Sequence, residues 1–203
     1  MRSTVKVLLT VVLFASPVAV DAKDRQARLI AETVDLFKAV LRDREAPLSP
    51  CLFPSTWGTY LLEASDFRHH LGARNTFRSR LTKQPPPLDE ILTQAGAPKE
   101  SICTLEQRKE AAKAARAALV SRSPETEAVS SLSYLKELDY NFPIYNARYS
   151  KAVIMLTTSA SGWRKEKDGR IHALGGMSGA LLVYGKRRGK WESLDYEEVF
   201  WAD

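Results

Sequence analysis

A glycine-rich segment around Ser178 is the first place in this sequence where chemistry could occur. The segment reads HALGGMSGALLVY from His172 to Tyr184. A serine beside a histidine, with an acidic partner such as Asp195, is the set of side chains that a serine hydrolase uses. A nucleophile elbow requires G-x-S-x-G at a sharp turn from a strand into a helix.

That local context is missing around Ser178. Gly179 follows the serine one place too early, and the residues after it are an apolar run and then a polar loop rather than a helix. We therefore expect the entrance to a strand, where glycines permit a bulge or a close approach of the backbone. An envelope hydrolase assembled from Ser178, His172 and Asp195 stays open as an alternative, and it requires these side chains to converge within hydrogen-bonding distance.

The other histidines and the carboxylates give no recognisable metal or acid–base motif. His69 and His70 are adjacent, so we expect them to point in different directions on a helix or a strand, and no H-x-x-x-H or Cys–His pair accompanies them. The acidic residues near the C-terminus, Asp195, Glu197 and Glu198, are interpreted as solvated surface. The sequence predicts no metal ion and no cofactor.

Two short basic segments are the candidate binding residues. The formal net charge is +6, and a basic surface favours anionic partners. The segments are expected in loops at opposite ends of one strand, so they form a single patch only if the first loop folds back. Trp163 is either an exposed interface anchor or buried under the sheet. The candidate residues are Trp163, Arg164, Lys165, Lys186, Arg187 and Arg188.

The first 22 residues are typical of a secretory signal peptide. Arg2 and Lys6 precede an apolar run, and the segment ends at Ala22 with small residues near a cleavage site. A retained anchor is the alternative. Cleavage removes two positive charges and one negative charge, which leaves a net charge of +5. No later stretch is apolar enough to cross a membrane, and we expect a periplasmic or secreted protein.

Cys51 and Cys103 both lie in the part that would be exported. Two cysteines in an oxidising compartment most simply pair with each other. Neither has the flanking motif of a catalytic cysteine. The sequence therefore predicts one disulfide.

The elements that must position these residues change in type along the chain. Apolar spacing predicts a helix over 23–44, a short helix after three prolines at 85–87, and a helix that begins after Thr104, where Gln107 completes a capping box. A polar connector with one helical turn around 133–138 is expected next. Extended runs then predict strands at 142–145, 151–158, 181–184 and 190–199, with a loop over 161–170.

Helices that precede strands indicate an α+β fold in one domain over 23–203. Residues 23–139 are predicted to be mainly helical. They are expected to pack on an antiparallel β-meander of three to four strands, formed by residues 140–203.

The closing portion resembles the end of various short exported bacterial proteins of uncharacterised function. The features concerned are Phe142-Pro143 at a strand start, an apolar strand over Ala152 to Leu156, Gly175-Gly176 with Gly179, and a final strand that begins Gly189-Lys190-Trp191. The likeness covers under a third of the chain. Many such proteins carry cysteines in the glycine-rich part, where this chain has none. The resemblance implies an exported meander and no activity.

These observations favour binding over catalysis. We expect an exported binding protein, such as an inhibitor or immunity-type protein, whose partner is another protein or an envelope component. Nucleic acid is not expected as a partner of an exported chain. An electrostatic binder of anionic envelope polymers is the remaining alternative, and salt would weaken such binding steeply.

Overall fold

The computed structural model describes residues 17–43, 51–60, 62, 64–72, 85–121, 131–166 and 168–202. Within these residues the chain has an α+β fold, as the sequence predicts, with helices mostly before strands. The helices are α1 (Pro17–Arg42), α2 (Ala64–Leu71), α3 (Leu88–Ala95) and α4 (Leu105–Ser121), with a short 3-10 turn, η2 (Lys99–Ser101).

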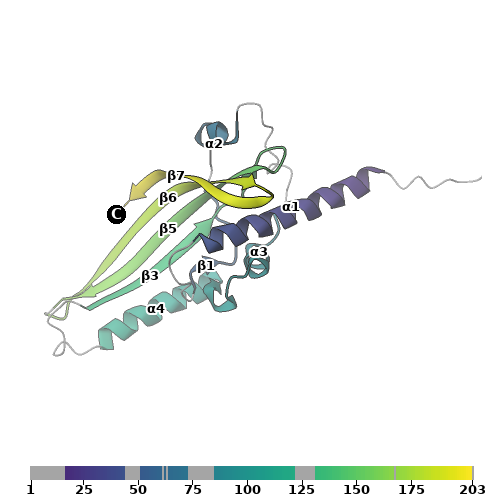
Figure 1. The fold of residues 1–203 in the computed structure, drawn as a ribbon. Helices are drawn as coiled ribbons and strands as arrows, with labels where there is room; N and C mark the ends of the chain where they lie inside the picture. Colours follow the sequence, from purple (N-terminus) through teal and green to yellow (C-terminus); the bar gives the residue numbers. More distant parts are fainter. Residues whose placement is uncertain are drawn as a thin grey trace, which may run out of the picture.

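A five-stranded antiparallel sheet forms the body of the molecule. Its main path is β3-β5-β6-β7, with β4 paired to β5. The bounds are β3 (Ser131–Tyr140), β4 (Ile144–Tyr145), β5 (Lys151–Lys165), β6 (Ile171–Arg187) and β7 (Lys190–Ala202). Figure 1 shows α4 running beside β3 toward one end of the sheet, while α1 crosses the sheet at the other end.

The sheet is buried on both faces near its centre. Side chains alternate between the faces of a strand. Ile154 and Tyr184 belong to a large core cluster with residues of α1 and α3, whereas Val153 and Leu181 join a smaller cluster with residues of α2. Even-numbered residues of β5 and β6 therefore face α1 and α3, and odd-numbered residues face α2.

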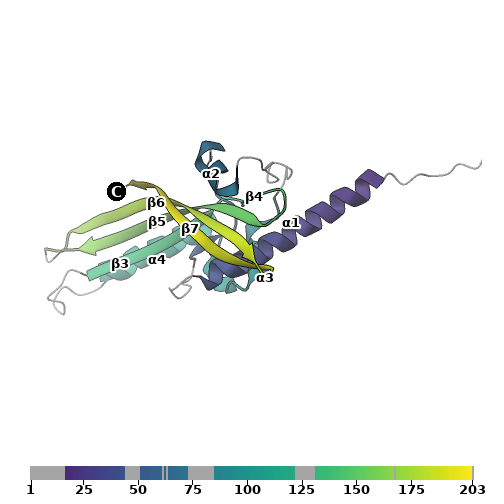
Figure 2. The ribbon, with the colours of Figure 1, turned by 45° about the horizontal axis from the view of Figure 1, so that its top comes forward.

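Helix α1 packs through the apolar face that its sequence predicts. Leu29, Phe37 and Val40 are buried, while the N-terminal end of α1 projects away from the sheet (Figure 2). Thr33 is also buried, and its hydroxyl donates to the Leu29 carbonyl at 2.7 Å. Tyr145 donates to Thr33 Oγ1 at 3.1 Å. Burial raises the pKa of Tyr145 well above its ordinary value, so the hydroxyl stays protonated as a donor.

The predicted disulfide between Cys51 and Cys103 is present, with Cα atoms 5.0 Å apart. It lies beside a short parallel pair of strands, β1 (Phe53–Pro54) and β2 (Ile102–Cys103). The capping box at the start of α4 is also confirmed. The Thr104 N–H donates to Gln107 Oε1 at 2.8 Å, and the Gln107 N–H donates to Thr104 Oγ1 at 3.3 Å.

The sheet has five strands where the sequence predicts three to four, and β3, β5 and β6 differ most from the predicted extents. Residues 131–140 form β3 rather than a connector with a helical turn, so the sheet begins inside the region predicted to be mainly helical. Strand β5 continues to Lys165, which places Trp163 in a strand instead of a loop. Strand β6 begins at Ile171, ten residues before the predicted start. Pairing with a neighbouring strand extends all three beyond their apolar runs.

Candidate functional site

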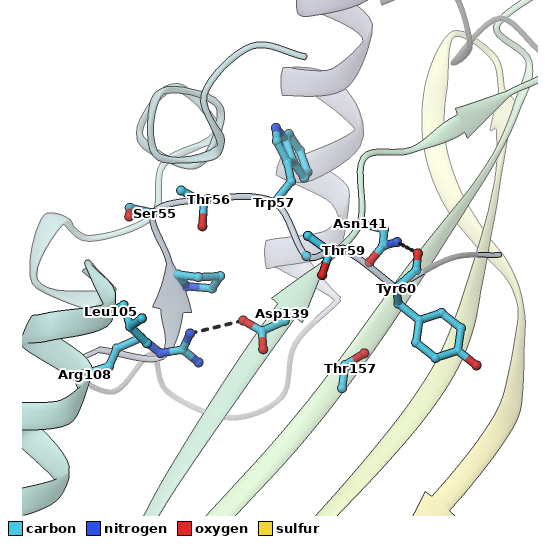
Figure 3. Close-up of a pocket in the computed structure, with 12 residues that line it drawn as sticks. Ser55, Thr56, Trp57, Thr59, Tyr60, Leu105, Arg108, Asp139, Asn141 and Thr157 are labelled. Atoms are coloured by element: carbon cyan, nitrogen blue, oxygen red, sulfur yellow. Dashed lines mark hydrogen bonds and ion pairs between the residues drawn. The ribbon is translucent and has the colours of Figure 1, made fainter. Parts of the chain in front are cut away.

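An open groove of about 420 Å³ lies where the N-terminus of α4 meets β3 (Figure 3). Its wall is the extended segment 54–60, and its other residues come from α4, β3, β5 and the chain after β3. The lining residues are Pro54, Ser55, Thr56, Trp57, Gly58, Thr59, Tyr60, Leu105, Arg108, Asp139, Asn141 and Thr157.

The wall segment is held to the rest of the fold mainly by backbone hydrogen bonds. The Ser55 N–H donates to the Cys103 carbonyl at 3.0 Å, and the Gly58 N–H donates to the Tyr140 carbonyl at 2.7 Å. The Asn141 amide donates to the Tyr60 carbonyl. These bonds fix the wall in an extended form that leaves the side chains of Thr56, Thr59 and Tyr60 exposed.

Trp57 anchors the same segment from the inside. Its ring packs edge-on against Phe142 at 5.0 Å between centroids and against Phe37 of α1 at 5.6 Å. Its indole N–H donates to the Pro86 carbonyl at 2.6 Å. Trp57 thereby ties the groove wall to α1 and to the chain before α3, so the wall is a fixed part of the fold.

Arg108 forms the floor of the groove. Its side chain is only 9% exposed, and it bridges two carboxylates of β3: Nη1 lies 3.2 Å from Asp139 Oδ1, and Nη2 lies 2.8 Å from Glu137 Oε2. Among the described residues, neither Nε nor Nη2 makes a hydrogen bond of good geometry. Because both atoms are buried, the guanidinium holds α4 on the sheet rather than offering itself to a ligand.

Two exposed apolar side chains mark the groove. Leu105, the first residue of α4, is 63% exposed, and Tyr60 is 41% exposed. Figure 3 shows them on opposite sides of the threonine side chains and of Asp139. The groove thus offers apolar surface at both ends and hydroxyl and amide groups between them. None of the described lining residues is a histidine, cysteine or lysine, and the carboxylate among them, Asp139, is paired with Arg108.

The structure does not bring Ser178, His172 and Asp195 together. Ser178 and His172 pair with Thr158 and Arg164 of β5. They share one face of β6 but are six residues apart, about 20 Å along an extended strand. Asp195 pairs with Val183, which faces the opposite side of the sheet.

The glycine-rich segment lies inside β6, whereas the sequence predicted the entrance to a strand that begins at Leu181. Gly179 is the point of close approach, because a Cβ placed there would lie 2.6 Å from Met155 Cε and would also collide with the Phe200 ring. A β-bulge in the pairing with β7 occurs at the same position, between Gly179 and Ala180. Packing therefore accounts for this glycine without any catalytic role.

The two basic segments lie at opposite ends of the β5–β6–β7 hairpins. Lys165 pairs with Ile171, and Arg187 pairs with Lys190, about 50 Å apart along β6. Several of the cations have partners: Arg164 pairs with Glu166, Arg187 with Glu192 and Lys186 with Glu32. Lys186 also lies over the Trp191 ring. Trp163 is partly buried in β5. The six residues do not form one patch, and Arg188 is exposed in the turn before β7.

The histidine pair forms a cluster that sequence reasoning missed. His69 and His70 end α2, and their Nε2 atoms lie 3.5 and 2.8 Å from Glu197 Oε2 on β7. The partners are 127 residues apart in the case of His70, so no local spacing could indicate the contact. The groove was missed for the same reason, because its residues come from four separate segments.

A comparison of the chain with protein-family models, with curated protein sequences and with solved structures found no significant match. None of the helices that the structure describes has the length and apolar character needed to cross a membrane.

Proposed function

We propose that this protein is an exported binding protein, in the periplasm or outside the cell, that holds a segment of a partner protein in the groove between Tyr60 and Leu105. An inhibitor or immunity-type protein is the form of this activity that we favour. The observation that carries the proposal is a preformed open groove whose two ends are exposed apolar side chains.

The chemistry of the groove favours recognition of a polypeptide. Exposed tyrosine and leucine side chains supply apolar contact area, and tyrosine is common among the residues that dominate binding energy at interfaces. Thr56, Thr59 and Asn141 add hydroxyl and amide groups that can bond to a partner backbone. The volume of about 420 Å³ is that of a small-molecule pocket, roughly 300–1,000 Å³, so the groove has room for a few side chains of a partner.

Binding is also a better account of the groove than catalysis. A serine or threonine nucleophile needs an adjacent base, and the histidines of the chain lie outside the groove. The one carboxylate in the lining, Asp139, is paired with Arg108. The alternative hydrolase assembled from Ser178, His172 and Asp195 would need side chains that are far apart on β6 and β7 to meet.

Export is supported by the disulfide, because such bonds persist in oxidising compartments. Removal of residues 1–22 is also compatible with the fold. Residues 23–28 are mostly exposed, and the first buried side chain of the mature helix is Leu29. The buried residues of α1 that the structure describes, from Leu29 onward, therefore all belong to the mature chain.

The test is to block the groove without disturbing the core. Thr56→Arg with Thr59→Arg places two long side chains in the groove from exposed positions. Thr93→Arg on α3 is the matched control, because Thr93 is equally exposed but does not line the groove. A photoreactive phenylalanine analogue at position 60 identifies what lies in the groove when the protein is mixed with envelope extract.

We expect position 60 to crosslink to a discrete protein, and the double variant to bind that protein at least about tenfold more weakly, a loss of about 1.4 kcal/mol. Thr93→Arg should bind as the wild type does. Equal binding by the double variant would overturn the proposal. Turnover of a substrate by the pure protein, lost on one polar substitution in the groove, would replace binding by catalysis. Binding that disappears at moderate salt but ignores the double variant would favour the electrostatic alternative.

A further inference from the structure

The cluster of His69, His70 and Glu197 joins α2 to the edge of the sheet and shares no residue with the lining of the groove. Among the described residues it is the group of three potential ligand side chains whose donor atoms all lie within 4.8 Å of one another. His70 is largely enclosed, with 9% of its side chain exposed, whereas His69 and Glu197 are about half exposed. A small ion could therefore reach the donor atoms from one side.

Adjacent histidines do not normally share a target, and the geometry here is the exception. The two imidazole rings lie close together, with centroids 3.9 Å apart and planes inclined by 41°. Both Nε2 atoms approach the same atom, Glu197 Oε2, at 3.5 and 2.8 Å. Glu197 pairs with Leu181 of β6 and shares the face of the sheet on which α2 packs through Phe67 and Leu71. Packing in the core beneath thus fixes the separation between the ligands.

The distances suit a metal ion that prefers nitrogen and oxygen ligands. Zinc bonds to histidine nitrogen and carboxylate oxygen are about 2.0–2.2 Å long, so two ligands at a tetrahedral angle lie roughly 3.4 Å apart. The separation between His69 and Glu197, 3.5 Å, is close to this value. The separation between His70 and Glu197, 2.8 Å, is that of a hydrogen bond, and it would have to increase by about 0.6 Å to admit the ion. Two imidazoles and one carboxylate with an open position are also a known ligand set for zinc.

We infer that His69 Nε2, His70 Nε2 and a Glu197 carboxylate oxygen bind one divalent transition-metal ion of the zinc class, with water in the open position. The ion would replace the present contact between His70 and Glu197, because an Nε2 atom that donates a proton to the carboxylate has no lone pair for a metal. Both imidazoles would be neutral in the bound form. This site is independent of the groove and of the proposed binding activity.

Two charged side chains near the cluster have opposite effects on its affinity for a cation. Lys151 Nζ donates to the His70 carbonyl at 3.1 Å, which places one positive charge near the ion. Asp195 lies two residues from Glu197 on the same strand face and adds negative charge. The two effects oppose each other, so the three direct ligands should determine the affinity.

The test is titration of the tag-free, chelator-treated chain with zinc chloride, followed by calorimetry. The sequence contains three histidines, and His172 lies elsewhere on β6, which makes His172→Ala the matched control. Glu197→Gln and His69→Ala change exposed side chains and should leave the fold intact, as circular dichroism would check. His70 is avoided because it is nearly buried.

We expect one zinc ion per chain, and affinity reduced at least tenfold in Glu197→Gln and in His69→Ala. Loss of a mere supporting residue around a metal commonly costs 10–100-fold, and loss of a direct ligand should cost no less. His172→Ala should bind as the wild type does. In a proton–carbon spectrum of the imidazoles, two of the three histidines should shift with zinc.

The inference is overturned if Glu197→Gln binds zinc as tightly as the wild type, because the ion would then be held only by surface imidazoles. It is also overturned if His172 shifts together with the other two, or if no heat is detected. The site and the proposed function fail separately, since the groove variants Thr56→Arg and Thr59→Arg should leave zinc binding unchanged.

Discussion

Removal of the Cys51–Cys103 disulfide is expected to cost about 4 kcal/mol of unfolding free energy. The bond closes a loop with a sequence separation of 52 residues. In the chain-entropy relation, a loop of this length removes about 14 cal/mol/K from the unfolded chain, or about 4 kcal/mol at 25 °C. The double variant Cys51→Ala, Cys103→Ala removes the bond without leaving a reactive thiol.

The native fold should survive this substitution, because other contacts hold the same place. The Cys51 N–H donates to the Glu100 carbonyl at 3.0 Å, and the Ser55 N–H donates to the Cys103 carbonyl at 3.0 Å. The stability loss therefore arises mainly in the unfolded chain, whose conformational freedom increases. The groove should keep its shape, since the wall and α4 retain these bonds.

The assay is urea unfolding of the oxidised wild type and of the double variant, followed by circular dichroism. With a typical slope of about 2 kcal/mol per molar urea, the midpoint should fall by about 2 M. A loss below about 1 kcal/mol would refute the reasoning, because the bond would not be restraining the unfolded chain. In cells, Cys51 and Cys103 of the wild type should not react with a thiol-alkylating probe, because the disulfide occupies both sulfur atoms. Free thiols in a cytosolic chain would contradict the expected export.

Two further substitutions test packing around the sheet. Arg108→Met should lower the unfolding free energy by about 3 kcal/mol, because Glu137 and Asp139 would be left partly buried without their counter-ion. The same urea unfolding assay measures this loss. Adding Glu137→Gln and Asp139→Asn to the variant should recover most of it. Gly179→Ala should cost about 1–3 kcal/mol, since the new methyl would displace Phe200 and Met155. Gly175→Ala in the same strand is the control, because the nearest atom to a Cβ at position 175, the Ala160 carbonyl oxygen, is 3.4 Å away. If Gly175→Ala destabilised the protein as much as Gly179→Ala, the cost at position 179 would not be steric.

Local signals in the sequence predicted the parts of the fold that depend on near neighbours. The capping box at Thr104 is formed by residues three apart, and the stop of α3 at Gly96 uses a left-handed conformation, φ 97°, that glycine readily adopts. The disulfide followed from composition and compartment, since the sequence offers two cysteines to pair. Each of these predictions depends on residues that are close together in the sequence or on the number of cysteines in it.

Strand β3 was missed although its sequence carries a signal. In SLSYLKELDY, the residues Leu132, Tyr134, Leu138 and Tyr140 recur at even spacing, which is the period of a strand. The charged residues between them suggested a polar connector. In the structure Leu138 and Tyr140 are buried in the main core, whereas Glu137 and Asp139 on the other face bind Arg108. The acidic residues on this face of β3 pair with a buried arginine of α4. No pattern within residues 131–140 predicts that contact.

The groove and the histidine cluster could not be predicted because each depends on long-range packing. Arg108 and Asp139 are 31 residues apart, and their contact exists because α4 packs against β3. His70 and Glu197 meet because α2 covers the face of the sheet that carries the odd-numbered residues of β5 and β6. The β-bulge between Gly179 and Ala180 shifts the pairing of β7 so that Glu197 lies on the same face. A shift of one residue in that bulge would turn Glu197 to the opposite face.

The amino-acid composition of β6 changes at the point where the strand leaves the hydrophobic clusters formed with α1, α3 and α2. From Ala180 to Gly185 the residues are mostly buried, whereas most residues from His172 to Met177 are exposed. The buried half reads ALLVYG and is apolar, because it lies between α1 and α3 on one face and α2 on the other. The exposed half reads HALGGM and carries smaller side chains, since no cluster of buried residues includes it. Ser178 stands at this boundary. The change from glycine-rich to apolar sequence, which first suggested a nucleophile in a turn, therefore marks the edge of the hydrophobic core within one continuous strand.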